Sequence, residues 1–136
     1  MTGLKTYDLF VSHAWKYNEG YYRLIEMLDA APRFVFRNYS IPEHDPLGAK
    51  TKRELEAALD RQIRPVNCFL AIAGMYVQHR EWIQFEIEAA QSYGKPIIGV
   101  RPWGSERTPT EIVLAADEMV NWNTASVVDA VRRRSL

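Results

Sequence analysis

The segment 66–73, VNCFLAIA, is the most apolar stretch that reads as a strand, and it restricts the fold more than any other feature. Its apolar side chains do not alternate with polar ones, so we expect the strand to be buried on both faces. Strands of this kind occur in parallel sheets that carry helices on each side. The segment therefore predicts a layered α/β domain.

Further apolar segments alternate with stretches of helical spacing along the whole chain. In the stretch 17–30, for example, Tyr21, Leu24, Ile25 and Leu28 recur at that spacing. We expect strands at 7–12, 34–36, 66–73, 95–100 and 118–122, and helices at 17–30, 49–63, 78–93, about 110–116 and 124–134. Gly94, with Pro96 beyond it, is predicted to end the third helix, and Thr124 to lie near the cap of the last.

This order predicts a single domain over residues 1–136, with a flavodoxin-like three-layer sandwich and a five-stranded parallel sheet of order 2-1-3-4-5. Ligands of such sheets bind beyond the carboxyl ends of the strands, where the strand order reverses. In this order the reversal lies between the first and third strands. The segments to search are therefore 12–17 and 73–78.

The composition is that of a globular domain, with 136 residues, of which 47% are hydrophobic and 25% charged. Seventeen basic and seventeen acidic residues cancel, so we expect neither nucleic acid nor a membrane surface as a partner. The only cysteine, Cys68, excludes a disulfide within the chain and is expected to be a buried, inert thiol. Residues 1–7 lack the features of a signal peptide, and we expect a soluble, cytoplasmic protein.

Glu86 does not fit its surroundings. On a helical wheel it falls near the middle of the apolar face of the helix 78–93, between Trp82 and Ile83 one turn before and Ala89 and Ala90 one turn after. An unpaired buried carboxylate is costly, so the acid either pairs with an arginine or a loop amide, or faces a ligand in a cleft. Its helix begins at the carboxyl end of the third strand, which favours the cleft.

The first strand supplies a second polar group of residues. Asp8 lies within the strand, and Ser12 and His13 follow at its carboxyl end. Asp8 either bonds neighbouring loop amides or contacts a ligand. Adjacent residues at a strand end point to opposite sides, so Ser12 and His13 do not form a nucleophile and its base.

Aromatic residues are concentrated near the predicted cleft, and Trp15 and Tyr76 are the candidates to stack on a nucleobase or nicotinamide ring. No glycine-rich phosphate loop follows the first strand. His44 and His79 have no recognisable metal-ligand spacing, so we expect no metal site.

In their order along the chain, these motifs resemble TIR domains. Residues 7–13, YDLFVSH, are similar to the first conserved box of that family. The segment 66–86 resembles its third strand, the loop that follows, and a helix with Trp82 and Glu86 four apart, and 95–100 matches the next strand. The resemblance covers about residues 5–101 and is to the compact bacterial and archaeal group that includes the TIR proteins of Thoeris anti-phage systems. The segment 38–50 departs from the family's pattern, so no contact is carried over to it.

The resemblance implies cleavage of NAD at the bond between nicotinamide and ribose, with NAD as the substrate and no cofactor. It gives Glu86 the catalytic role. The residues that we expect to contact the substrate are Asp8, Ser12, His13, Trp15, Tyr76 and Trp82. The expected partners are NAD, further copies of the chain, and a separate effector protein that responds to a cyclic or conjugated ADP-ribose product.

Two other functions fit the sequence. Many TIR domains are adaptors that only self-associate, because a fold does not establish catalysis. A nucleoside deoxyribosyltransferase-like enzyme would use a cleft glutamate on a similar sheet as nucleophile. A phosphoacceptor receiver domain is disfavoured, because the third strand ends without an aspartate.

Overall fold

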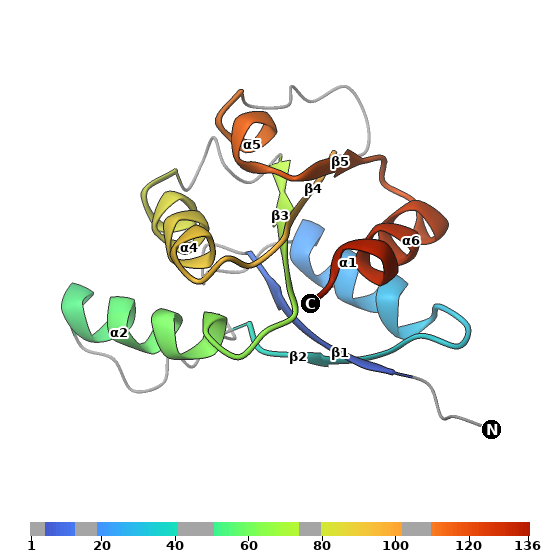
Figure 1. Cartoon of the computed structure of the whole chain (residues 1–136), viewed down its shortest axis with the longest axis horizontal. Coiled ribbons are helices and arrows are strands. Elements are labelled where there is room, and N and C mark those ends of the chain that lie inside the picture. The colour runs from blue at the N-terminus through green and yellow to red at the C-terminus, as the bar shows by residue number, and fades with distance from the viewer. Residues whose placement is uncertain (1–4, 13–18, 41–50, 74–79, 102–109) are drawn as a thin grey trace.

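A computed structural model describes residues 5–12, 19–40, 51–73, 80–101 and 110–136. Its centre is a five-stranded, all-parallel sheet of order β2-β1-β3-β4-β5 (Figure 1). The strands are β1 (Thr6–Val11), β2 (Val35–Asn38), β3 (Cys68–Ile72), β4 (Ile97–Val100) and β5 (Glu118–Val120). The predicted α/β class and strand order are confirmed.

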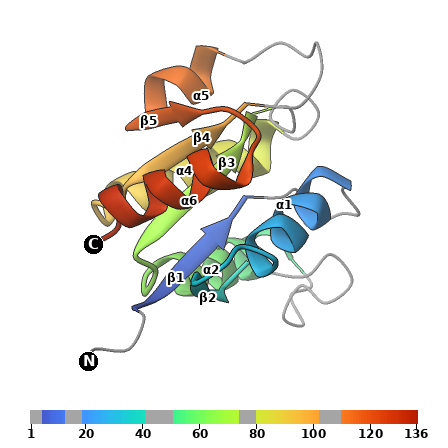
Figure 2. The same ribbon diagram turned by 90° about the vertical axis from the view of Figure 1, so that its right-hand side faces the viewer.

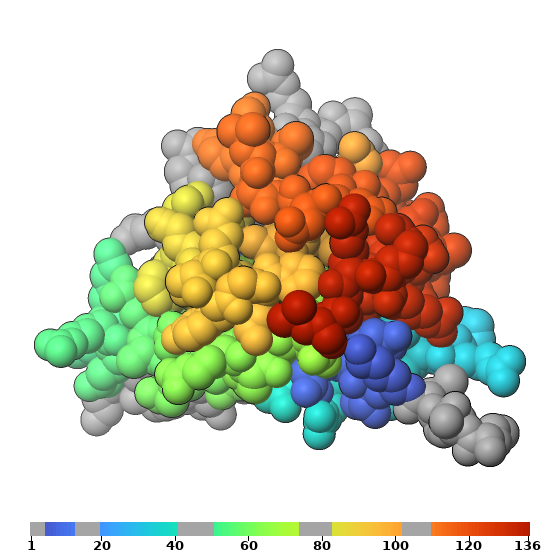
Figure 3. All heavy atoms as spheres, in the orientation of Figure 1, coloured from blue at the N-terminus to red at the C-terminus, as the bar shows by residue number. Residues whose placement is uncertain are grey.

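Five helices among the described residues cover the two faces of this sheet. They are α1 (Glu19–Asp29), α2 (Lys52–Ile63), α4 (Arg80–Ser92), α5 (Thr110–Ala115) and α6 (Thr124–Arg134). Helices α1 and α6 lie side by side on one face, and α2, α4 and α5 lie on the other (Figures 1 and 2). In the view of Figure 3, helices and side chains cover most of the sheet. The predicted three-layer arrangement is present.

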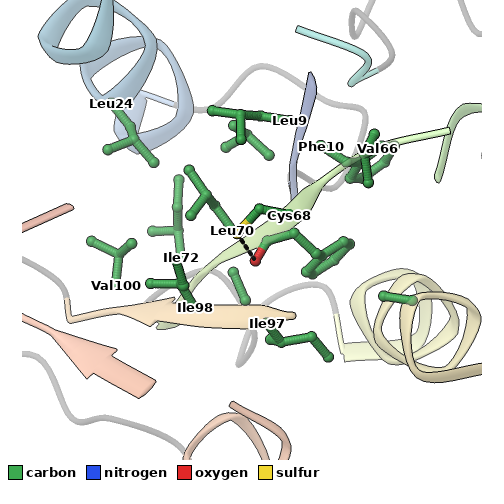
Figure 4. Packing of buried hydrophobic residues seen from close by; sticks show 14 of the residues in the cluster. Leu9, Phe10, Leu24, Val66, Cys68, Leu70, Ile72, Ile97, Ile98 and Val100 are labelled. Carbon is green, nitrogen blue, oxygen red and sulfur yellow. Dashed lines mark hydrogen bonds between the residues drawn. The ribbon is translucent and has the colours of Figure 1, made fainter. Parts of the chain in front are cut away.

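The core is built around β3, of which all five residues are buried. Leu70 and Ile72 lie toward Leu24 of α1 on one face (Figure 4). On the other face Phe10 and Phe69 stack, with ring centroids 5.4 Å apart. The prediction that this strand is buried on both faces is therefore confirmed.

The end of α4 has the geometry predicted for it. Gly94 has a φ of +66°, its N–H donates to the carbonyl of Gln91, and the N–H of Lys95 donates to the carbonyl of Ala90. This pair of bonds is the Schellman motif, which favours glycine at the left-handed position. At the start of α6 Thr124 lies next to the cap, as predicted. The cap itself is Asn123, whose side chain accepts a bond from the N–H of Ser126.

Helix α4 is tied to α2 by a polar contact that the sequence does not reveal. Tyr93 has helical spacing with the apolar face of α4, but the residue is 37% exposed. Its hydroxyl contacts both carboxylate oxygens of Asp60, at 2.9 and 2.8 Å. Arg64 donates to the same carboxylate and lies 5.9 Å from the Tyr93 ring centroid. The cluster helps to hold α4, the helix that carries Glu86, in place on the sheet.

The arginines at the end of α6 attach that helix to β5. Arg133 and Arg134 both bond the carboxylate of Glu118, at 2.6 and 2.9 Å, and they lower the pKa of Glu118 to about 2. Arg132 donates to the carbonyl of Arg33. Cations in a last helical turn also favour the helix dipole, but their described partners are a strand and a turn.

Gly99 in β4 leaves room for the side chain of Met119. A Cβ added at Gly99 would lie 2.9 Å from Met119 Cε and 3.2 Å from Ile112 Cγ2, and closer still to Met119 Sδ. Because the closest atoms are the end of the flexible Met119 side chain, we expect Gly99→Ala to lower the free energy of unfolding by about 1 kcal/mol through overpacking, the low end of the usual range. Urea unfolding of the single and double variants with Met119→Ala measures the coupling. The cost of Gly99→Ala should shrink in the Met119→Ala background, and an equal cost in both backgrounds would contradict this origin.

Candidate active site at the strand-order reversal

A hydrogen bond joins the two most buried polar side chains on the ligand edge of the sheet. The Ser12 hydroxyl donates to Oε1 of Glu86 over 2.9 Å, across 74 positions of the chain. Ser12 is 0% exposed and Glu86 is 1% exposed. The prediction that Glu86 faces inward from α4 is confirmed, and within the described part of the chain its bonding partner is a neutral hydroxyl rather than an arginine.

The fold explains why these two residues meet. Ser12 follows the last residue of β1, and its N–H donates to the carbonyl of Leu70 in β3 over 2.8 Å, which continues the strand pairing to this point. Glu86 lies in the middle of α4, the helix that follows β3 among the described residues. Strands β1 and β3 are neighbours, and the strand order reverses between them. The pair therefore lies where open α/β sheets bind their ligands.

Burial dominates the electrostatics of Glu86. It raises the pKa of this carboxyl well above its usual value of 4.5, and the hydrogen bond from Ser12 lowers it by a smaller amount. The surrounding side chains are apolar: Ile83, Ile87 and Ala90 of the same helix are all buried. A negative charge in these surroundings is poorly solvated, so a cation that comes close would be strongly attracted.

Asp8 lies elsewhere on β1 and has a partner of its own. It forms a two-bond ion pair with Arg37 of β2, with Nε–Oδ1 and Nη2–Oδ2 distances of 2.6 and 3.0 Å. Ser12 lies four positions further along the strand, about 13 Å away. Among the described residues, the Asp8 carboxylate thus pairs with an arginine and with no loop amide, and it does not lie beside Glu86. Its substrate-binding role stays a prediction.

The side chains of four further predicted site residues are not described by the structure. His13, Trp15 and Tyr76 lie outside the described residues, as do His44 and His79. The backbone of α4 places Trp82 one turn before Glu86, as the motif requires, and its side chain is outside the description. Their roles also stay predictions.

A second polar cluster at the carboxyl end of β2 was not predicted as a unit. The hydroxyls of Tyr21 and Ser40 lie 2.7 Å apart, and the Asn38 amide donates to the Tyr21 hydroxyl over 2.9 Å. Ser40 also bonds the Asn38 side-chain oxygen through its N–H and its hydroxyl. Helical spacing marks Tyr21 as a core residue, and Asn38 and Ser40 belong to no motif, so only the fold brings them together.

Other features of the described residues are separate from this pair. A hollow of about 430 Å³ lies at the amino end of β4, the opposite edge of the sheet, and Gln91, Lys95 and Asp117 help to line it.

Burial raises the pKa of the Cys68 thiol to about 12, which agrees with an inert cysteine. Among the described residues no group of three or more His, Cys, Asp or Glu could hold a metal ion. No helix among them has the length and apolar character needed to cross a bilayer.

Glu86→Gln should stabilise the folded domain above pH 5. Because the pKa of Glu86 is raised in the folded state, that state keeps a proton that the unfolded chain releases above its usual pKa of 4.5, so wild-type stability falls as the pH rises through this range. Glutamine does not titrate. At pH 8 we expect a gain of about 1 kcal/mol, which is about 4 °C in Tm for a domain of this size.

Thermal unfolding at pH 4.5 and pH 8 checks this prediction. The gain in Tm of Glu86→Gln over the wild type should be smaller at pH 4.5. Glu88→Gln is the matched control, because Glu88 is an exposed acid on the same helix. Glu86→Gln that is less stable than the wild type at both pH values would show that the carboxylate has a stabilising partner.

Comparison with known proteins agrees with the TIR resemblance. The family model described as Thoeris protein ThsB, TIR-like domain, matches residues 10–107. This span is more than half of the 136 residues, and it contains both Ser12 and Glu86. No curated protein matches the chain. The chain therefore belongs to the TIR-like domain family of the Thoeris protein ThsB, a membership that implies a role in anti-phage defence.

Proposed function

We propose that the protein cleaves NAD at the bond between nicotinamide and ribose, with Glu86 as the acid that stabilises the transition state. The observation that carries the proposal is the position of Glu86: a carboxyl group that is 1% exposed, at the strand-order reversal, in a family associated with anti-phage signalling. A buried acid at a ligand edge is more often functional than one elsewhere, because its burial costs stability.

The chemistry suits a single carboxylate. When the bond between ribose C1′ and the pyridinium nitrogen breaks, its electron pair goes to the nitrogen, and nicotinamide leaves as a neutral molecule that needs no proton. Positive charge then develops on the ribose, and a carboxylate in apolar surroundings stabilises that charge strongly. Water, or another nucleophile in the site, adds to C1′ and loses a proton.

To act in this way, Glu86 has to be ionised, and the substrate has to reach its carboxyl group. The substrate's cationic ring lowers the pKa of a nearby carboxyl group and so opposes the effect of burial. The 1% exposure of Glu86 means that groups around it move before a ribose makes contact. Self-association of the chain is a source of such a rearrangement, and a separate effector protein would respond to the nucleotide product.

The direct test is nicotinamide release from NAD by the wild-type protein, Glu86→Gln and Glu88→Gln. We expect release by the wild type and by Glu88→Gln, and a loss of about 10²–10³-fold in kcat for Glu86→Gln. The protein is assayed at high concentration with a crowding agent, and its assembly is followed by light scattering. Chromatography with mass spectrometry identifies the product as ADP-ribose, a cyclic isomer or a conjugate.

Two outcomes of this experiment would reject the proposal. An assembled, folded sample that releases no nicotinamide would favour the adaptor function, with Glu86 as a structural acid. Exchange of bases between deoxynucleosides, measured in the same instrument, would favour a deoxyribosyltransferase-like enzyme.

The pH dependence gives a second prediction. Because the ionised form of Glu86 is the active one and burial raises its pKa, kcat/KM for NAD should rise with pH and level off only above the usual carboxyl range around 4.5. Initial rates of nicotinamide release from pH 4.5 to 8.5 measure the profile. A rate already constant from pH 5 upward would mean that Glu86 ionises like an exposed acid in the working site.

A further inference from the structure

Strand pairing at the centre of the sheet sets the position of the Ser12 hydroxyl. Its own N–H pairs with Leu70 of β3 over 2.8 Å, and the residue is 0% exposed. The neighbouring side chains Val11 and Leu70 are also fully buried. The position of the hydroxyl is therefore set by strand pairing, which is more rigid than a loop.

The hydrogen bond of this hydroxyl determines what it can do for a ligand. A serine hydroxyl has a single proton to donate, and in this structure that proton is directed to Oε1 of Glu86 over 2.9 Å. While the bond persists, Ser12 has no proton for a substrate oxygen. The same bond restricts the rotation of the Glu86 carboxyl group, and it engages Oε1 and not Oε2.

We propose that Ser12 is a positioning residue: it holds the Glu86 carboxylate in its working orientation, in place of contacting NAD itself. The inference rests on the proposed function, since it assigns Ser12 a part in the same site. The bond also favours the ionised form of Glu86, because a donated proton stabilises a carboxylate more than a neutral carboxyl group. Ser12 thus offsets part of the effect of burial and keeps more of the acid in its active form.

The experiment compares Ser12→Ala with the wild type in NAD cleavage. We expect kcat to fall roughly 10- to 100-fold, the usual effect of removing a hydrogen bond to a charged group. KM should change little, because the substrate loses no direct contact. The midpoint of the pH profile should move upward. Ser12→Thr, which keeps the hydroxyl, should restore kcat and the midpoint at least in part.

Ser92→Ala is the matched control. It removes a hydroxyl from α4 that donates to the carbonyl of Ala89 over 2.7 Å, near the far end of the helix from the site. It should change neither kcat nor the pH midpoint. A Ser12→Ala variant that raises KM and leaves kcat unchanged would overturn the proposal and make Ser12 a substrate contact.

A measurement without substrate separates this proposal from the proposed function. The ¹³C signal of the Glu86 carboxyl group, assigned by its absence in Glu86→Gln, is titrated in the wild type and in Ser12→Ala. A midpoint that is higher in Ser12→Ala supports the positioning role even if no NAD is cleaved. An unchanged midpoint in a folded Ser12→Ala variant overturns it, whether or not the wild type is active.

Discussion

The structure depends on the complete burial of β3. A strand without a polar face is stable only if both of its faces are covered, and the domain meets this need with α1 and α6 on one side and α2, α4 and α5 on the other. Parallel strands require crossover connections, so each strand is followed by a helix that starts at the carboxyl edge of the sheet. The burial of one strand therefore gathers the starts of several helices at the same edge, and the Ser12–Glu86 pair lies there.

The Ser12–Glu86 pair lowers the stability of the fold that holds it in position. A carboxyl group with one described hydrogen bond, in a shell of isoleucine and alanine, lowers the stability of the domain at neutral pH. Apolar contacts around it and the Tyr93–Asp60 contact between α4 and α2 offset that cost. The same apolar shell gives the carboxylate its strength toward a positive charge, because little water is present to screen it. The burial that lowers stability at this residue is therefore the property on which its proposed function depends.

Much of the fold could be predicted because local rules and tertiary packing agree. Gly94 was predictable from the end of a helical pattern, and the left-handed backbone there is one that glycine adopts freely. The inward direction of Glu86 followed from a helical wheel, which needs only the spacing of 3.6 residues per turn. Thr124 was predicted to lie near the cap of α6, and it does. The sequence did not single out Asn123 as the cap, since both residues are good caps and the choice depends on which side chain reaches the free amide.

The sequence by itself determined the parallel α/β layers, the burial of β3, and the inward face of α4, because these depend on periodicity along one segment. The partners of the polar side chains were decided only by the tertiary structure. Asp8 meets Arg37, Tyr93 meets Asp60, and Tyr21 meets Asn38 and Ser40, because strand register and helix packing bring them together. Above all, the bond between Ser12 and Glu86 joins residues 74 positions apart, and no local pattern specifies such a distance in the chain.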